Sequence, residues 1–154
     1  MSTWYRKVQS DLTQLPSCII FFEKELDDAR NHLGLKGKSL ERHAADLAGI
    51  VEHRFGQLQE IEAILEFLNL NLKKVKSAKF KYYLEGYAKA LTSRDCEKYA
   101  EGHPDVVSAA LLVNEFAMVR NKYLALSKGF ETKNWMIGHI VRLRVAGLDD
   151  AKVD

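Results

Sequence analysis

The chain has 154 residues, the length of one ordinary domain, and 47% of them are hydrophobic while 29% are charged. This balance excludes an intrinsically disordered chain, which would have fewer aliphatic residues and a larger net charge than the +2 found here. No apolar run approaches the ~20 residues that cross a bilayer, and no apolar segment follows a basic start, so we expect a cytoplasmic protein without a membrane partner.

Charge is distributed unevenly along the chain. Residues 20–66 carry six Lys or Arg against ten Asp or Glu, a net charge of −4. Residues 69–89 carry six Lys against one Glu, a net charge of +5, and residues 128–147 have a net charge of +3. Basic zones beside acidic or neutral helices are typical of a protein that binds a polyanion.

The N-terminal part, residues 1–38, predicts two helices and a loop. Residues 3–14 have the pattern of a short amphipathic helix that Pro16 ends. Residues 18–33 carry an apolar stripe at helical spacing, and a loop with two glycines follows at residues 34–38.

A helical pattern without proline then runs from Leu40 to about Ala90, and Ser39 is a suitable N-cap for it. Apolar residues fill the a and d positions of its heptads with one polar interruption at Arg54; they are Ala44, Leu47, Val51, Leu58, Ile61, Leu65, Leu68, Leu72 and Val75. This seam predicts coiled-coil-like packing over roughly 70 Å at about 1.5 Å per residue. At the end of the seam, Lys79 and Tyr82 replace the aliphatic residues.

Two further helices are predicted after a mixed stretch at residues 91–103. Pro104 suits the first turn of a helix over residues 104–127, which we expect Gly129 to end as the glycine after the C-cap. A final helix over residues 130–145 follows.

These elements predict an all-α, single-domain bundle of long, coiled-coil-like helices. Its helical core spans residues 39–147, and residues 148–154 form a frayed tail.

The basic segment, residues 73–89, begins with five lysines in nine residues and continues with two tyrosines: Lys73, Lys74, Lys76, Lys79, Lys81, Tyr82 and Tyr83. Lysines neutralise phosphates with release of counterions, and unpaired bases stack on aromatic rings at about 1–3 kcal/mol per base. Between Leu72 and Tyr83 there is no Arg, Asn or Gln to recognise duplex base edges. The pattern favours sequence-independent binding of single strands. A solvated lysine face with the tyrosines in the core, or an acidic protein or lipid partner, explains the same composition.

No catalytic or metal-binding pattern is recognised. The triplet at residues 37–39, Gly-Lys-Ser, lacks the first glycine of a phosphate-binding loop, since residue 32 is His. No histidine pairs with another His or a Cys at helical spacing, and Glu62 and Glu66 lack the Glu-x-x-His pattern of di-metal bundles. We expect no enzyme activity, no cofactor and no metal, with Cys18 and Cys96 as reduced structural thiols.

Three short segments of the C-terminal half occur in an order and spacing shared with one protein family. Residues 79–86 read Lys-Phe-Lys-Tyr-Tyr-Leu-Glu-Gly, residues 101–105 form a polar turn before a long helix, and residues 128–134 read Lys-Gly-Phe-Glu-Thr-Lys-Asn. Together they resemble the UvsY-type recombination mediators of T-even-like bacteriophages over roughly residues 70–145. That family's basic-x-basic pair before Tyr-Tyr maps onto Ser77 and Lys79, so one basic position is missing here.

The resemblance implies a ring-like homo-oligomer, a hexamer or heptamer, in the host cell cytoplasm. Such proteins bind single-stranded DNA and help load a RecA-like recombinase onto strands covered by a single-strand-binding protein during recombination and repair. The lysines and tyrosines of the basic segment would contact the DNA.

The terminal apolar helix suits subunit contacts through Trp135, Met136, Ile137 and Ile140, although an intramolecular core explains these residues equally well. The alternative function is a helical structural or adaptor protein that assembles through the heptad seam without a nucleic-acid role.

Overall fold

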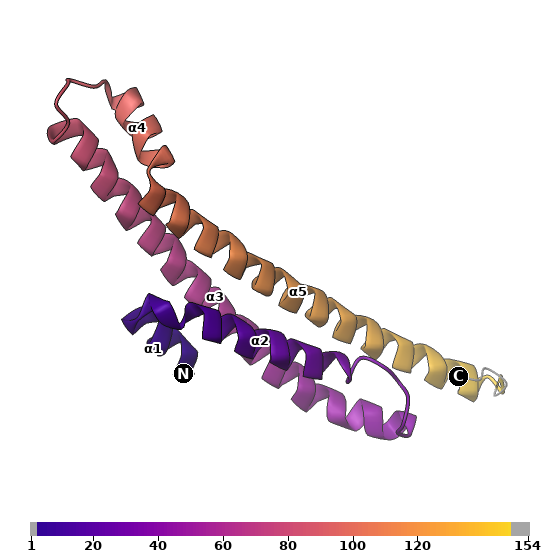
Figure 1. The fold of residues 1–154 in the computed structure, drawn as a ribbon. Coiled ribbons are helices and arrows are strands. Elements are labelled where there is room, and N and C mark those ends of the chain that lie inside the picture. The colour runs from indigo at the N-terminus through magenta and orange to yellow at the C-terminus, as the bar shows by residue number, and fades with distance from the viewer. Residues whose placement is uncertain (1–2, 149–154) are drawn as a thin grey trace.

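The computed structural model describes residues 3–148, which form an all-α single domain (Figure 1). The helices are α1 (Thr3–Ser10), α2 (Leu15–Arg30), α3 (Leu40–Glu85), α4 (Ser93–Gly102) and α5 (Pro104–Val145), with a 3₁₀ turn at Leu12–Gln14. No strand occurs within this range. Residues 149–154, most of the predicted frayed tail, lie outside it. Among residues 3–148 no helix combines the length and the apolar character that a bilayer crossing requires.

The long helices α3 and α5 form an antiparallel hairpin that runs the length of the molecule (Figure 1). Helix α2 lies along one part of the hairpin, and α1 packs against α3, where the Tyr5 backbone N–H donates to Glu60 Oε1 at 3.1 Å. Helix α4 lies at the opposite end, which we call the tip, against α3 and the start of α5. The hairpin is therefore covered by α2 along one part of its length and by α4 at the tip.

The predicted long helix is confirmed as α3. Ser39 has extended backbone angles, and its hydroxyl accepts a hydrogen bond from the Arg42 N–H, as an N-cap does. The helix ends at Glu85, earlier than the predicted Ala90, and the Gly86 N–H closes it on the Tyr82 carbonyl at 2.9 Å.

The predicted single helix over residues 3–14 is wrong. Helix α1 ends at Ser10, and Asp11 begins a 3₁₀ turn by accepting hydrogen bonds from the Thr13 N–H at 3.0 Å and hydroxyl at 2.7 Å. Pro16 lies in the first turn of α2 instead of ending α1. Its missing N–H costs nothing there, since the first N–H groups of a helix have no intrahelical partner.

The predicted break at Gly129 is also wrong, because α5 continues from Pro104 to Val145. A glycine inside a helix costs only about 1 kcal/mol relative to alanine, which tertiary packing can offset. Here Leu33 packs directly on Gly129, and a Cβ at this position would lie 2.8 Å from Leu33 Cδ2. Phe130 and Ile137 are buried beyond the glycine and hold the helix on the core.

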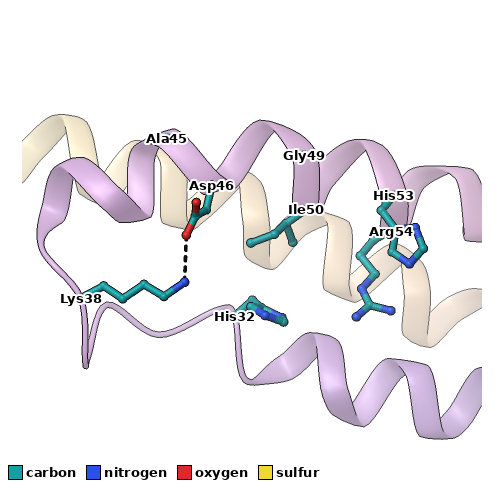
Figure 2. A pocket seen from close by; sticks show the side chains of 8 residues that line it. All are labelled: His32, Lys38, Ala45, Asp46, Gly49, Ile50, His53 and Arg54. Carbon is teal, nitrogen blue, oxygen red and sulfur yellow. Dashed lines mark hydrogen bonds and ion pairs between the residues drawn. The ribbon is translucent and has the colours of Figure 1, made fainter.

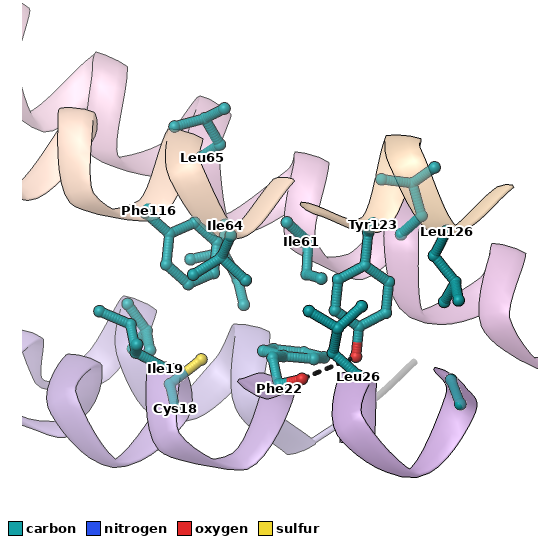
Figure 3. Close-up of a cluster of buried hydrophobic side chains, with 14 of the residues drawn as sticks. Cys18, Ile19, Phe22, Leu26, Ile61, Ile64, Leu65, Phe116, Tyr123 and Leu126 are labelled. Atoms are coloured by element: carbon teal, nitrogen blue, oxygen red, sulfur yellow. Dashed lines mark hydrogen bonds between the residues drawn. The ribbon is translucent and has the colours of Figure 1, made fainter. Parts of the chain in front are cut away.

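The core forms where α2 meets the hairpin (Figure 3). The Phe22 ring packs edge-on against Phe116 and Tyr123, with centroids 6.5 and 6.1 Å apart. The Tyr123 hydroxyl donates to the Phe22 carbonyl at 3.0 Å, so the buried phenol is satisfied. Cys18 and Cys96 are both buried and unpaired thiols, as the sequence predicts.

Arg54, the polar interruption of the seam, is buried and binds α2. Its guanidinium nitrogens donate to Glu25 at 2.8 Å and to Asp28 at 2.9 Å, and Gln57 completes the network. The interruption thus specifies how α2 docks. The seam itself is not buried throughout, since Ala44 and Val51 remain exposed.

Candidate nucleic-acid interface

The last turns of α3 divide the five predicted lysines between two faces. Lys73, Lys74 and Lys81 lie on the exposed face together with Tyr82. Within residues 3–148 neither Lys73 nor Lys74 makes an ion pair, and Lys81 Nζ lies 4.0 Å from Glu85, at the limit of one. These three ammonium groups are available to an anionic ligand, because an exposed ion pair such as Lys81–Glu85 contributes little to stability.

Lys76 and Lys79 point to the other face, where acidic residues meet them. Lys76 Nζ lies 2.9 Å from Glu101 of α4, and Lys79 Nζ lies 3.1 Å from Asp105 in the first turn of α5. The hydrogen bond that the Lys76 ammonium donates to the Glu101 carboxylate raises the pKa of Lys76. Both lysines therefore connect α3 to its neighbours at the tip. Because their charges are already paired, each would interact less strongly with a phosphate.

The predicted tyrosines belong to a larger aromatic cluster at the tip. Half-buried Tyr83 is its centre, with ring centroids 5.2 Å from Tyr82, 5.7 Å from Tyr87, 5.5 Å from Tyr99 and 6.3 Å from His103. The rings of Tyr87 and Tyr99 are 6.3 Å apart at an interplanar angle of 26°, and both are about half exposed. Sequence reasoning missed Tyr99, because only the docking of α4 brings it to Tyr83, and it did not single out Tyr87, which follows Tyr83 by four residues within the basic segment.

Local sequence fixes α4 in this place. The Thr92 hydroxyl accepts from the Asp95 N–H at 3.2 Å and donates to the Asp95 carboxylate at 2.7 Å, which caps the helix. Cys96 and Ala100 are its buried face, so Tyr99 emerges beside the α3 tyrosines. His103 then caps α5 by accepting the Asp105 N–H at its Nδ1.

The tip therefore combines a row of exposed lysines with exposed aromatic rings. Such a surface can neutralise phosphates and stack on planar groups, which are the two elements of single-strand binding. Within the described range no group of three or more His, Cys, Asp or Glu could hold a metal ion.

A pocket of about 590 Å³ between α3 and the loop before it offers no comparable surface (Figure 2). Its two permanent cations are already paired: Lys38 Nζ lies 2.8 Å from Asp46, and Arg54 binds Glu25 and Asp28. His32, which lines the pocket, accepts a hydrogen bond at its carbonyl from buried Lys133; Lys133 also lies 3.3 Å from His43 Nδ1, and burial lowers the pKa of Lys133.

The four residues predicted for oligomerisation do not lie on one surface. Trp135 is 69% exposed and Met136 is 48% exposed, whereas Ile137 is buried in the intramolecular core. Ile140 is half-buried. The outward face of this part of α5 therefore carries Trp135 and Met136, and Ile137 supports the fold.

No protein-family model matches the chain, and comparisons with curated proteins and with solved structures give no match either. The resemblance to UvsY-type mediators therefore stays a prediction from the sequence.

Proposed function

We propose that the protein is a single-stranded DNA-binding recombination mediator that helps load a RecA-like recombinase onto DNA covered by a single-strand-binding protein. One observation carries the proposal: the exposed lysines Lys73, Lys74 and Lys81 lead along α3 to the half-exposed rings of the tip. The order of the three short motifs in the C-terminal half supports the same function.

The chemistry of the tip favours a single strand over a duplex. Aromatic rings stack on unpaired bases, which a duplex does not offer. Three phosphate contacts per protomer would give a salt slope of only about −2, at about −0.7 per phosphate, so one protomer binds weakly. A homo-oligomer, a hexamer or heptamer, would multiply these contacts along one strand through avidity.

The test is fluorescence anisotropy of labelled single-stranded and duplex oligonucleotides across a salt series. We expect tight, salt-sensitive binding that favours the single strand. Replacing Lys73, Lys74 and Lys81 together by alanine should weaken that binding at least ~10-fold at low salt and flatten the salt dependence.

The matched control removes the same charge elsewhere. Lys24, Arg30 and Lys36 are exposed residues of α2 and of the loop after it, away from the tip, and their triple alanine variant should bind DNA like the parent protein. Equal losses in both variants would show that only net charge matters, and this would reject the assigned surface. A protein that binds at this surface is then tested for loading a RecA-like recombinase onto covered strands.

The alternative, a helical structural or adaptor protein, is favoured by the ion pairs of Lys76 and Lys79, which explain two of the five lysines by the fold alone. In that case the protein assembles but binds neither single strand nor duplex, even at low salt.

A further inference from the structure

An apolar groove runs between α3 and α5 on the side of the hairpin that faces away from α2. It has a volume of about 960 Å³ and is lined on α3 by Ala44, Ala48, Val51 and Phe55. On α5, Leu124 is among the lining residues. Phe55 is 54% exposed, while Val51 and Leu124 are about 40% exposed.

At the groove, α3 and α5 leave open a position that a further helix would fill in a helical bundle. Arg54 and Gln57 on α3 bind α2, and Arg54 also lines one edge of the groove, whose apolar α3 residues continue at helical spacing on the adjoining face. Ala44 and Ala48 have small side chains, which let another helix approach the α3 backbone closely. Contiguous exposed apolar surface of this kind marks an interaction site.

The end of α5 is an apolar helix without a partner inside the described chain. Residues 141–148 are all exposed, and Val141, Leu143 and Val145 are among them. Figure 1 shows this end projecting past the loop between α2 and α3. Trp135 and Met136 lead into it on the exposed side of the helix.

Charges on the two surfaces are complementary. From Thr132 to Leu148 the chain has no acidic residue, and Arg142 and Arg144 are exposed. The groove is edged by Glu52, which makes no ion pair within residues 3–148, and by Glu131. Arg54 binds α2, and Lys128 and Glu131 pair with each other at 3.0 Å, so Glu52 is the carboxylate at the groove that stays available to a basic partner.

We propose that the groove between α3 and α5 receives the terminal part of α5, with Trp135, from a second copy of this chain. The proposal rests on the homo-oligomer of the proposed function but not on its DNA binding. A chain cannot fill its own groove in this way, because α5 is one continuous helix. Its residues up to Asn134 line the groove, and the following residues to Val145 extend about 16 Å further along the same axis.

The first experiment measures self-association by light scattering and sedimentation. We expect the protein to assemble at micromolar concentration, and Trp135→Ser to raise the dissociation constant at least ~30-fold, as for a central tryptophan of an interface. Ile20→Ser is the matched control, because Ile20 is also about two-thirds exposed but lies on α2. It should assemble like the parent protein.

The second experiment tests the pairing itself. Glu52→Arg and Arg142→Glu should each weaken assembly, and their combination in one chain should restore it, because the charges then pair again between copies. A Phe55→Cys chain and a Met136→Cys chain, mixed under oxidation, should form a disulfide between the two variants in preference to one between two copies of the same variant. Both native cysteines are fully buried and do not compete.

A monomeric parent protein at high micromolar concentration would overturn the proposal, and so would assembly that Trp135→Ser or the charge reversals leave unchanged. Far-UV circular dichroism checks that each variant folds. DNA binding is scored separately by anisotropy. Loss of assembly with residual single-strand binding supports both proposals, whereas normal assembly without DNA binding rejects the mediator function alone.

Discussion

At the scale of single residues, two helical glycines differ in what surrounds them. A Cβ added at Gly56 on α3 would meet nothing within 4 Å, whereas one at Gly129 would lie 2.8 Å from Leu33 Cδ2. Gly56→Ala should therefore raise the free energy of unfolding by about 1 kcal/mol through helix propensity alone. Gly129→Ala should raise it less or lower it, because Leu33 must move. Urea denaturation of both variants measures the difference, and equal stabilisation would refute the contact.

Cys18 is a second residue whose burial has a measurable consequence. Burial raises the pKa of the Cys18 thiol to about 12, with a further contribution from the charge of Glu60. Above pH 9 the unfolded chain loses this proton while the folded chain keeps it, so the folded state is destabilised as pH rises. The contribution is about 1 kcal/mol per pH unit.

The measurement is the free energy of unfolding of the parent protein and of Cys18→Ala between pH 9 and 10. The variant should lose some packing energy at every pH but show the shallower decline. Other alkaline groups, including Lys133 and Tyr123, titrate in both proteins and cancel in the difference. Parallel pH profiles would mean that the thiol ionises in the folded state as easily as in the unfolded one.

At the scale of elements, the N-cap of α4 controls the aromatic cluster. The Thr92 side chain caps this helix, and α4 carries Tyr99 to the α3 tyrosines. Thr92→Ala should destabilise α4 by about 1 kcal/mol. Amide hydrogen exchange over residues 93–102 should accelerate, while exchange in the core of α3 stays unchanged. Thr92→Ser, which keeps the hydroxyl, is the control and should behave like the parent protein.

The elements also show what the sequence could and could not predict. The long α3 was predictable, because a proline-free heptad pattern begins right after Ser39. The continuity of α5 was not, because Gly129 is explained by Leu33, almost a hundred residues earlier. Likewise, Lys76 looked free in the sequence, but its partner Glu101 comes from α4. Local patterns thus predicted the helical class and the start of α3, whereas the end of α1, the continuity of α5 and the side-chain orientation at the candidate site were not predicted.

At the scale of the whole molecule, burial is graded along the hairpin. The fully buried side chains of α3 end at Leu68, and from Leu72 to Tyr83 none is fully buried, although α4 packs there. Most fully buried residues, such as Phe22 of α2, Ile61 and Tyr123, lie where α2 packs on the hairpin, whereas the tip contributes Cys96 and Ala100 of α4. Local stability follows buried apolar contact, so the tip should open more easily than the part covered by α2.

Native-state hydrogen exchange tests this gradient directly. Protection on α3 should be highest over residues 57–68, where exchange reports global unfolding, and should fall past residue 72. If the tip binds single-stranded DNA, added oligonucleotide should slow exchange there and leave residues 57–68 unaffected, since ligands stabilise the segments that they contact. Uniform protection along α3 would show that the hairpin unfolds as one unit.

Because a loosely held tip can adjust its rings and lysines to an irregular strand, the same gradient that lowers its stability would suit it to a sequence-independent ligand.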